Sequence, residues 1–181
     1  EVRWQRPLRL LDLGTGSGCI AVTLARRLPT CVVVGVELSW DALRIARINI
    51  RRHVVAKRVL AIQGSWLSAI RGAVDGIISN PPYVPSGVVD QLPLDVRREP
   101  RVSLDGGPDG LEALRDLVGQ APRVLRPLGV LVLECGEEHV DALREAVRGA
   151  PWVEQVAPLA DLAGRPRGIL ATRAEARSWN A

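Results

Sequence analysis

The sequence holds few residues of the kinds that bind metals or form disulfides. Its 181 residues include two histidines and three cysteines, and the cysteines do not show Cys-x-x-Cys spacing. We therefore expect neither a zinc site nor a histidine-based catalytic triad. An odd number of cysteines, each in or beside an apolar run, is typical of buried free thiols in a reducing compartment.

Long apolar runs are also absent. No stretch approaches the roughly twenty apolar residues of a membrane-spanning helix, and the first ten residues, EVRWQRPLRL, lack the apolar core of a signal peptide. These features predict a cytoplasmic protein without a membrane partner. Because the first predicted strand starts within a few residues of Glu1, we expect a fragment or a trimmed chain.

Apolar strands alternate with amphipathic helices along the chain. The predicted strands span residues 8–13, 31–38, 58–63, 74–79 and 129–135, with two weaker strands at 152–157 and 168–173. The predicted helices span residues 18–28, 41–52, 111–125 and 138–149. This alternation predicts a parallel sheet joined by right-handed crossovers, in one domain that covers residues 1–181.

Two features refine this pattern. In the second predicted helix, Leu43, Ala46, Ile50 and Val54 recur at steps of three or four residues, so we expect them on one face. The segment 85–110 is long, polar and rich in proline and glycine. Because core-type strands resume after it, we predict an active-site loop there rather than a linker.

The segment DLGTGSGC, residues 12–19, joins the first predicted strand to the first predicted helix. Its three glycines permit a tight turn and a close approach of a ligand to the N–H groups of the helix. The dinucleotide fingerprint G-x-G-x-x-G would need glycine where this chain has Cys19. The pattern instead favours a ligand with a carboxylate and a ribose, whose ammonium group Asp12 could meet directly or through water. A tight turn without a ligand is the alternative.

Two further strand ends follow the glycine loop. Glu37 ends the second strand, where an acidic residue accepts hydrogen bonds from the hydroxyls of a ribose; alternatively it stabilises the start of the next helix, which Ser39 already caps. After the third strand, Trp66 could cover an adenine face and Ser65 could bond its edge. A tryptophan that only closes the core fits equally well. Together the three strand ends predict a slot for S-adenosylmethionine.

The segment SNPPYV, residues 79–84, contains the only tyrosine of the chain and follows the apolar strand VDGIIS. Ligands of open α/β sheets bind at the carboxyl ends of the strands, so this segment is a candidate substrate site. The alternative is a rigid turn, because each proline ring fixes φ and restricts the residue before it.

The segments DLGTGSG, VELSWDALRIARIN, GSW, SNPPYV, REPRVSLDGGPDGL and LAGRPRGILATR together resemble the HemK/PrmC family, the N5-glutamine methyltransferases of peptide-chain release factors. The resemblance covers nearly the whole chain. It implies a class I, Rossmann-like α/β methyltransferase fold, with a mostly parallel seven-stranded sheet and helices on both faces. It also implies S-adenosylmethionine as cofactor and, as protein partner, a release factor whose Gly-Gly-Gln glutamine receives the methyl group during the maturation of the translation termination machinery.

The candidate residues follow from the strand ends and the resemblance together. The predicted cofactor site consists of Asp12, Gly14, Thr15, Gly16, Gly18, Glu37, Leu38, Ser65, Trp66 and Asn80. The predicted substrate site consists of Asn80, Pro81, Pro82 and Tyr83, with Asn80, Pro81 and Tyr83 as catalytic residues and no metal.

The implied chemistry explains the residue types of the NPPY sequence. A carboxamide nitrogen is a poor nucleophile, because its lone pair is delocalised into the carbonyl group. The side-chain oxygen of Asn80 and the carbonyl of Pro81 can each accept one N–H of the substrate amide and aim its nitrogen at the sulfonium methyl group. The face of Tyr83 is expected to cover the planar amide and exclude water.

The chain departs from the family pattern in three places. Ser65 stands where the family has an acidic residue beside the adenine edge, and Gly168 stands where an aromatic residue is usual. The N-terminal helical domain of the family, which helps to hold the release factor, is not part of this chain. We therefore expect the chemistry to be retained and the docking of the protein substrate to be weaker.

Two other functions are considered. A DNA or RNA adenine N6-methyltransferase would grip a flipped base with the same NPPY sequence, and the net charge of +4 is mild support for an acidic partner. Neither a contiguous basic groove nor a target-recognition region is evident, so no stable nucleic-acid binding is expected. A non-catalytic module that binds S-adenosylmethionine is the other alternative, and the intact sequence from Asn80 to Tyr83 argues against it. The oligomeric state is left open.

Overall fold

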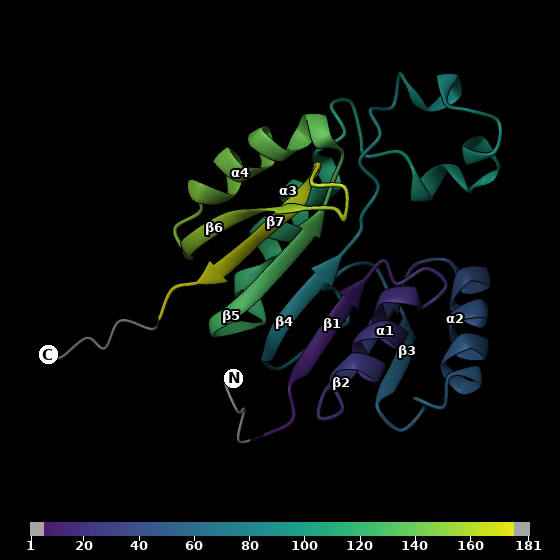
Figure 1. The fold of residues 1–181 in the computed structure, drawn as a ribbon, viewed down its shortest axis with the longest axis vertical. Helices are drawn as coiled ribbons and strands as arrows, with labels where there is room; N and C mark the ends of the chain where they lie inside the picture. The colour runs from purple at the N-terminus through teal and green to yellow at the C-terminus, as the bar shows by residue number, and fades with distance from the viewer. Residues whose placement is uncertain (1–5, 176–181) are drawn as a thin grey trace, which may run out of the picture.

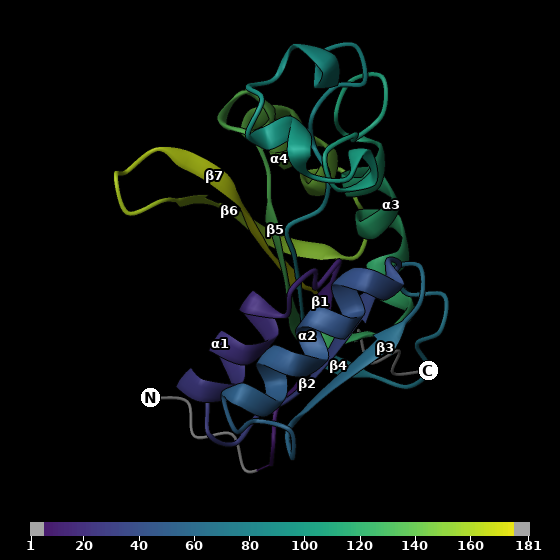
Figure 2. The ribbon, with the colours of Figure 1, turned by 90° about the vertical axis from the view of Figure 1, so that its right-hand side faces the viewer.

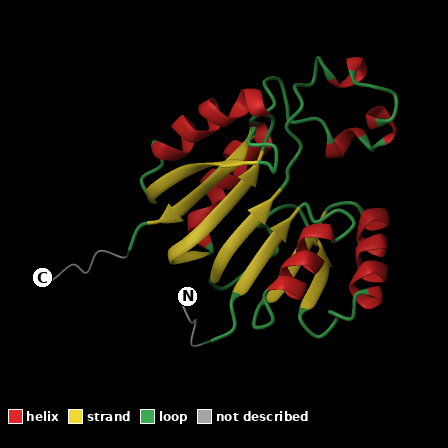
Figure 3. Ribbon diagram, viewed as in Figure 1, coloured by secondary structure: helices red, strands yellow, loops and turns green. Residues whose placement is uncertain are grey.

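The computed structural model describes residues 6–175, which form a seven-stranded sheet with helices on both faces (Figures 1 and 3). The strand order across the sheet is β3-β2-β1-β4-β5-β7-β6, and all neighbouring strands are parallel except that β7 runs antiparallel to both β5 and β6. The strands are β1 (Arg9–Leu13), β2 (Val32–Glu37), β3 (Val59–Gln63), β4 (Val74–Ser79), β5 (Leu125–Glu134), β6 (Val153–Ala160) and β7 (Pro166–Arg173). This arrangement confirms the predicted class I methyltransferase fold.

Four α-helices and five short 3-10 turns connect the strands. The helices are α1 (Cys19–Arg27), α2 (Trp40–Arg52), α3 (Glu112–Gln120) and α4 (Val140–Arg148). The 3-10 turns are η1 (Val89–Gln91), η2 (Val96–Arg98), η3 (Arg101–Ser103), η4 (Ala121–Arg123) and η5 (Glu137–His139). Within residues 6–175, no helix combines the length and the apolar character that crossing a bilayer requires.

Two hydrophobic clusters form because successive residues of a strand point to opposite faces of the sheet. Leu10 belongs to the cluster with the buried sides of α1 and α2, whereas the next residue, Leu11, belongs to the cluster with α3 and α4. The two pairs of helices lie on opposite faces of the sheet (Figure 2). The central strands are therefore covered on both faces, which explains why their sequences are continuous apolar runs.

The structure corrects two predicted boundaries. The helix predicted over residues 111–125 ends at Gln120, and η4 follows it, because Pro122 has no N–H for an α-helical bond. The next strand starts at Leu125 rather than at the predicted residue 129. The pairing of this strand with β4 shifts register after Leu125, so the residues RPLG form an irregularity within the strand and not a turn before it.

The predicted face of α2 is correct for three of its four residues. Leu43, Ala46 and Ile50 are buried, but Val54 is 89% exposed. The helix ends at Arg52, and Val54 adopts a left-handed φ of 57°, so the neighbouring Val55 takes the buried position instead.

The segment 85–110 lies beyond the carboxyl ends of β1 and β4, where the chain changes from one side of the sheet to the other (Figure 1). It carries η1, η2 and η3 and contains no strand of the sheet. Its position next to the topological switch point agrees with the prediction of an active-site loop.

Candidate active site

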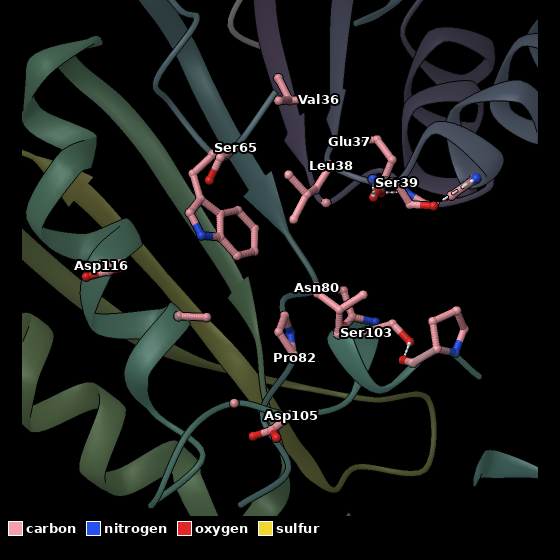
Figure 4. A pocket seen from close by; sticks show the side chains of 18 of the residues that line it. Val36, Glu37, Leu38, Ser39, Ser65, Asn80, Pro82, Ser103, Asp105 and Asp116 are labelled. Atoms are coloured by element: carbon pink, nitrogen blue, oxygen red, sulfur yellow. Dashed lines mark hydrogen bonds between the residues drawn. The ribbon is translucent and has the colours of Figure 1, made fainter. Parts of the chain in front are cut away.

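A cavity of about 470 Å³ opens at the carboxyl ends of the first four strands (Figure 4). Its opposite wall comes from the segment 85–110 and from α3. Eight of the predicted site residues line this pocket: Gly14, Gly16, Glu37, Leu38, Ser65, Trp66, Asn80 and Pro82. The pocket therefore joins most of the predicted cofactor slot to part of the predicted substrate site.

Glu37 connects two parts of the pocket wall. Its Oε2 accepts a hydrogen bond from Gly16 N and its Oε1 accepts one from Ser39 N, both at 2.8 Å. The Ser39 hydroxyl oxygen accepts from Ala42 N and caps α2, as predicted. The carboxylate thus holds the glycine loop and the start of α2 together, and it remains half-buried at the pocket wall with lone pairs available to a ribose.

The glycine loop takes a shape that glycine favours. Gly14 and Gly16 have left-handed φ angles of 69° and 56°, which residues with a side chain adopt only with strain. The N–H groups of Gly14 and Thr15 both donate to the carbonyl oxygen of Val36, at 2.9 and 3.0 Å. The loop is therefore tied to the end of β2 and presents its main chain to the pocket.

Asp12 does not line the pocket, and the predicted direct contact with an ammonium group is not available to it. Its side chain is fully buried, and its Oδ2 accepts from the Thr15 hydroxyl at 2.5 Å and from Ala21 N at 2.9 Å. Burial raises the pKa of Asp12, and these two hydrogen bonds oppose that rise. Asp12, Thr15 and Gly18 are buried residues of this segment and do not line the pocket.

Trp66 contacts both the hydrophobic core and the pocket. Its side chain is partly buried against the hydrophobic cluster below α3, and it also lines the pocket. Its ring faces the glycine loop, since a Cβ placed on Gly14 would lie 3.5 Å from it. Leu38 is 56% exposed, and Ser65 is exposed. Figure 4 shows Leu38 and Ser65 at the border of the same open space as Asn80.

The NPPY sequence divides between the pocket and the core. Asn80 is exposed and Pro82 is half-buried, and both line the pocket, whereas the Pro81 ring is buried. No main-chain N–H of residues 6–175 is bonded to the carbonyl oxygen of Pro81. Both predicted acceptor groups thus stand at the end of β4, with the Asn80 side chain in the pocket.

Tyr83 is placed differently from the prediction. It does not line the pocket, and it packs half-buried against the hydrophobic cluster of α3 and α4. Burial raises the pKa of the Tyr83 hydroxyl, and the guanidinium of Arg167 partly offsets that rise. Among the residues that line the pocket, Pro82 and not Tyr83 therefore forms the wall beside Asn80.

The sequence reasoning did not identify the residues of the second wall. The segment 85–110 and α3 contribute Glu99, Pro100, Val102, Ser103, Asp105, Gly106, Gly107, Glu112, Ala113 and Asp116. Most of them belong to REPRVSLDGGPDGL, which the resemblance singled out without a role for each residue. That motif was the signal from which they could have been found.

The charged side chains that line the pocket are all acidic. They are Glu37, Glu99, Asp105, Glu112 and Asp116, with no lysine, arginine or histidine among the lining residues. Asp105 is engaged locally: it accepts from Ser86 Oγ at 2.6 Å and from Arg101 Nε at 3.0 Å. An acidic pocket attracts cationic ligands such as a sulfonium or an ammonium group and disfavours phosphates.

Comparison with known proteins supports a methyltransferase. Residues 4–92 match the methyltransferase small domain family. The chain is 46% identical over 169 residues to the release factor glutamine methyltransferase of Moorella thermoacetica, covering 92% of this chain and 59% of the relative. It is 38% identical over 146 residues to the ribosomal protein uL3 glutamine methyltransferase of Neisseria meningitidis, covering 80% of this chain and 48% of that protein. The chain thus spans between about half and three fifths of the length of these relatives.

The fold is also shared with solved structures. A crystal structure of a methyltransferase from Pyrococcus furiosus superimposes with a TM-score of 0.70 at 22% sequence identity. The match covers 94% of this chain and 77% of that one.

Proposed function

This chain belongs to the release factor glutamine methyltransferase family, and from that premise we propose that it transfers a methyl group from S-adenosylmethionine to the side-chain nitrogen of a protein glutamine. The proposed acceptor is the glutamine of the Gly-Gly-Gln sequence of a peptide-chain release factor. Since release factors act on ribosomes, the proposed location is the cytoplasm.

The residues of the pocket fit the proposed cofactor. The Glu37 carboxylate would accept from the ribose hydroxyls, Leu38 and Trp66 would contact the adenine, and the main chain at Gly14 and Gly16 would approach the amino-acid end. The acidic lining suits a ligand that carries an ammonium group and a sulfonium group. When bound, S-adenosylmethionine would supply a methyl group that is activated by its positive sulfur.

The main contribution of the chain to the reaction would be to orient the amide. The Asn80 side-chain oxygen and the Pro81 carbonyl oxygen would each accept one N–H of the substrate carboxamide, which points its nitrogen toward the cofactor side of the pocket. Positive charge would develop on this nitrogen as its bond to the methyl carbon forms and the methyl–sulfur bond breaks, and the two oxygen dipoles would stabilise it until one N–H proton is lost. Pro82 would pack against the flat amide and exclude water.

One observation carries this proposal: the Asn80 side chain lies in the same pocket as Glu37, at the ends of two different strands. A cofactor on Glu37 would therefore place its reactive group near the Asn80 oxygen. The acidic lining also weighs against the adenine methyltransferase alternative, because a nucleic acid would bring phosphates toward five carboxylates.

The proposal is tested with the purified chain, S-adenosylmethionine and two substrates, a Gly-Gly-Gln peptide and an intact release factor. Mass spectrometry should locate one added methyl group on the glutamine, and a matched Gly-Gly-Glu peptide should remain unmodified. Asn80→Ala should lower kcat by about 10² to 10³-fold, as the loss of one hydrogen bond to a developing charge does in other enzymes, while the cofactor Kd should stay near that of the wild type.

Three outcomes would contradict the proposal. They are wild-type turnover in Asn80→Ala, transfer to an adenine of DNA or RNA in place of the glutamine, and cofactor binding without transfer to either substrate. A parallel reaction with ribosomal protein uL3 distinguishes the two acceptor proteins for which the relatives are named.

A further inference from the structure

The motif REPRVSLDGGPDGL, residues 98–111, lies against the main chain that follows Pro82. Val84 N donates to the carbonyl oxygen of Leu104 at 2.9 Å, and Gly106 N donates to the carbonyl oxygen of Val84 at 2.8 Å. Val84 also forms a parallel β-bridge with Asp105. The main chain of the motif is thus joined at Val84 to the segment that continues from Asn80.

Gly106 lies where this pairing leaves no room for a side chain. A Cβ at position 106 would be 2.7 Å from the Tyr83 Cα atom, 2.7 Å from the Gly110 carbonyl oxygen and 2.8 Å from the Pro82 carbonyl oxygen. Real Cβ atoms essentially never come so close, and all three neighbours are main-chain atoms that cannot rotate away. The φ angle of Gly106 lies outside the left-handed region, so this position requires glycine for space and not for conformation.

Gly110 also lies against the main chain of Tyr83. A Cβ there would collide with the Tyr83 carbonyl oxygen and lie 3.0 Å from Nε2 of the buried His139. Its φ of 77° is also left-handed. Gly110 therefore lies between Tyr83 and His139, which is the last residue of η5.

The motif is also anchored to α3. Glu112 N, at the start of this helix, donates to the carbonyl oxygen of Gly106 at 3.0 Å. A displacement of Gly106 would therefore have to disturb either the start of α3 or the segment around Pro82 and Tyr83. A side chain at position 106 would meet the main chain of Pro82 and Tyr83 directly, so the displacement would reach that segment.

We propose that Gly106 and Gly110 are positioning residues for methyl transfer. By lacking side chains, they let the motif seat against Pro82 and Tyr83, and this contact sets where the Asn80 and Pro81 acceptor oxygens stand relative to the cofactor side of the pocket. The inference rests on the proposed function, because the acceptors are those assigned to the substrate amide. It assigns a role to a motif that contributes no donor or acceptor to the proposed reaction.

The test compares Gly106→Ala with Gly87→Ala. Gly87 is a matched control: it belongs to the same loop, is exposed, has no heavy atom within 4 Å of its Cβ position, and has no left-handed φ. Gly106→Ala should lower kcat by up to about 10²-fold, the cost of misplacing a reacting group by about 1 Å, and leave the cofactor Kd within about twofold. Gly87→Ala should behave as the wild type.

Two results would overturn the proposal. One is a Gly106→Ala enzyme with wild-type kcat. The other is a Gly106→Ala enzyme whose cofactor affinity falls by the same factor as its kcat and whose melting temperature is also lower. If Gly106→Ala does not fold, His139→Ala removes the support from behind without adding atoms. A lower kcat at unchanged cofactor Kd then supports the proposal, and wild-type kcat contradicts it.

A readout that does not depend on transfer separates this inference from the proposed function. The NMR shifts of the Asn80 side-chain amide should move in Gly106→Ala and stay in place in Gly87→Ala. If the wild type fails to methylate the glutamine but these shifts move as expected, the proposed function is wrong, whereas the proposal that Gly106 positions Asn80 is supported. If the wild type is active and the shifts do not move, the proposal that Gly106 positions Asn80 is wrong.

Discussion

Replacing Glu37 by glutamine should weaken cofactor binding, although the two side chains have nearly the same shape. Each carboxylate oxygen of Glu37 accepts one main-chain N–H, from Gly16 on one side and from Ser39 on the other. An amide offers one oxygen and one NH₂ group, so it can accept from only one of these donors. In Glu37→Gln the NH₂ group would face the other N–H, donor against donor.

The magnitude follows from the bond that is lost. A hydrogen bond to a charged group contributes about 1.5 to 3 kcal/mol, and about 1.4 kcal/mol corresponds to a tenfold change in Kd. We therefore expect the cofactor Kd of Glu37→Gln to rise by about 10 to 150-fold, because one of the two main-chain hydrogen bonds to this side chain is lost and the ribose loses a charged acceptor. Glu37→Ala removes both bonds and should bind at least as weakly.

Calorimetric titration of S-adenosylmethionine into the three proteins measures the effect, with melting temperatures recorded alongside. Asp41→Asn is a suitable control: it removes another acidic side chain near the start of α2, 90% exposed and outside the pocket lining. Its Kd should equal that of the wild type. A Glu37→Gln protein with wild-type affinity would show that neither the loop tie nor the ribose contact depends on this carboxylate.

Two further predictions concern stability and thiol reactivity. Hydrogen bonds from Arg6, with additional attraction from Arg126, lower the pKa of the buried Asp75 from 3.8 to about 2, so Asp75 stabilises the fold above about pH 4 and this contribution is lost as the pH falls through 2. Urea unfolding should show Asp75→Asn to be less stable than the wild type by about 2 kcal/mol at pH 7, with the gap closing near pH 2; a constant gap would refute this reasoning. Iodoacetamide at about pH 8 should alkylate the exposed Cys19 and spare Cys135, because burial raises the pKa of the Cys135 thiol to about 11. Equal rates in peptide mass spectrometry would contradict that expectation.

The sequence alone determined the sheet, its helices and the strand ends that carry the pocket. These are local properties, because an apolar run, a turn and an amphipathic helix each depend on neighbouring residues. Once the strands are parallel, their carboxyl ends meet at one edge of the sheet. The predictions that Glu37, Trp66 and Asn80 share a pocket follow from this geometry without knowledge of any long-range contact.

Tertiary structure decided which side chain of each strand end points into the pocket. Asp12 and Tyr83 belong to the same motifs as Gly14 and Asn80, yet they turn inward, because the core around them offers hydrogen bonds to one and apolar contacts to the other. Val54 shows the same limit, since the helix that would have buried it ends two residues earlier.

The second wall of the pocket depended on tertiary structure most of all. Residues 98–111 have no apolar periodicity from which a position could be derived, and they reach the site through main-chain pairing with Val84. Such pairing joins residues that lie about twenty positions apart along the chain. The need for glycine at position 106 is visible only in the folded structure, because the atoms that exclude a side chain belong to Pro82, Tyr83 and Gly110.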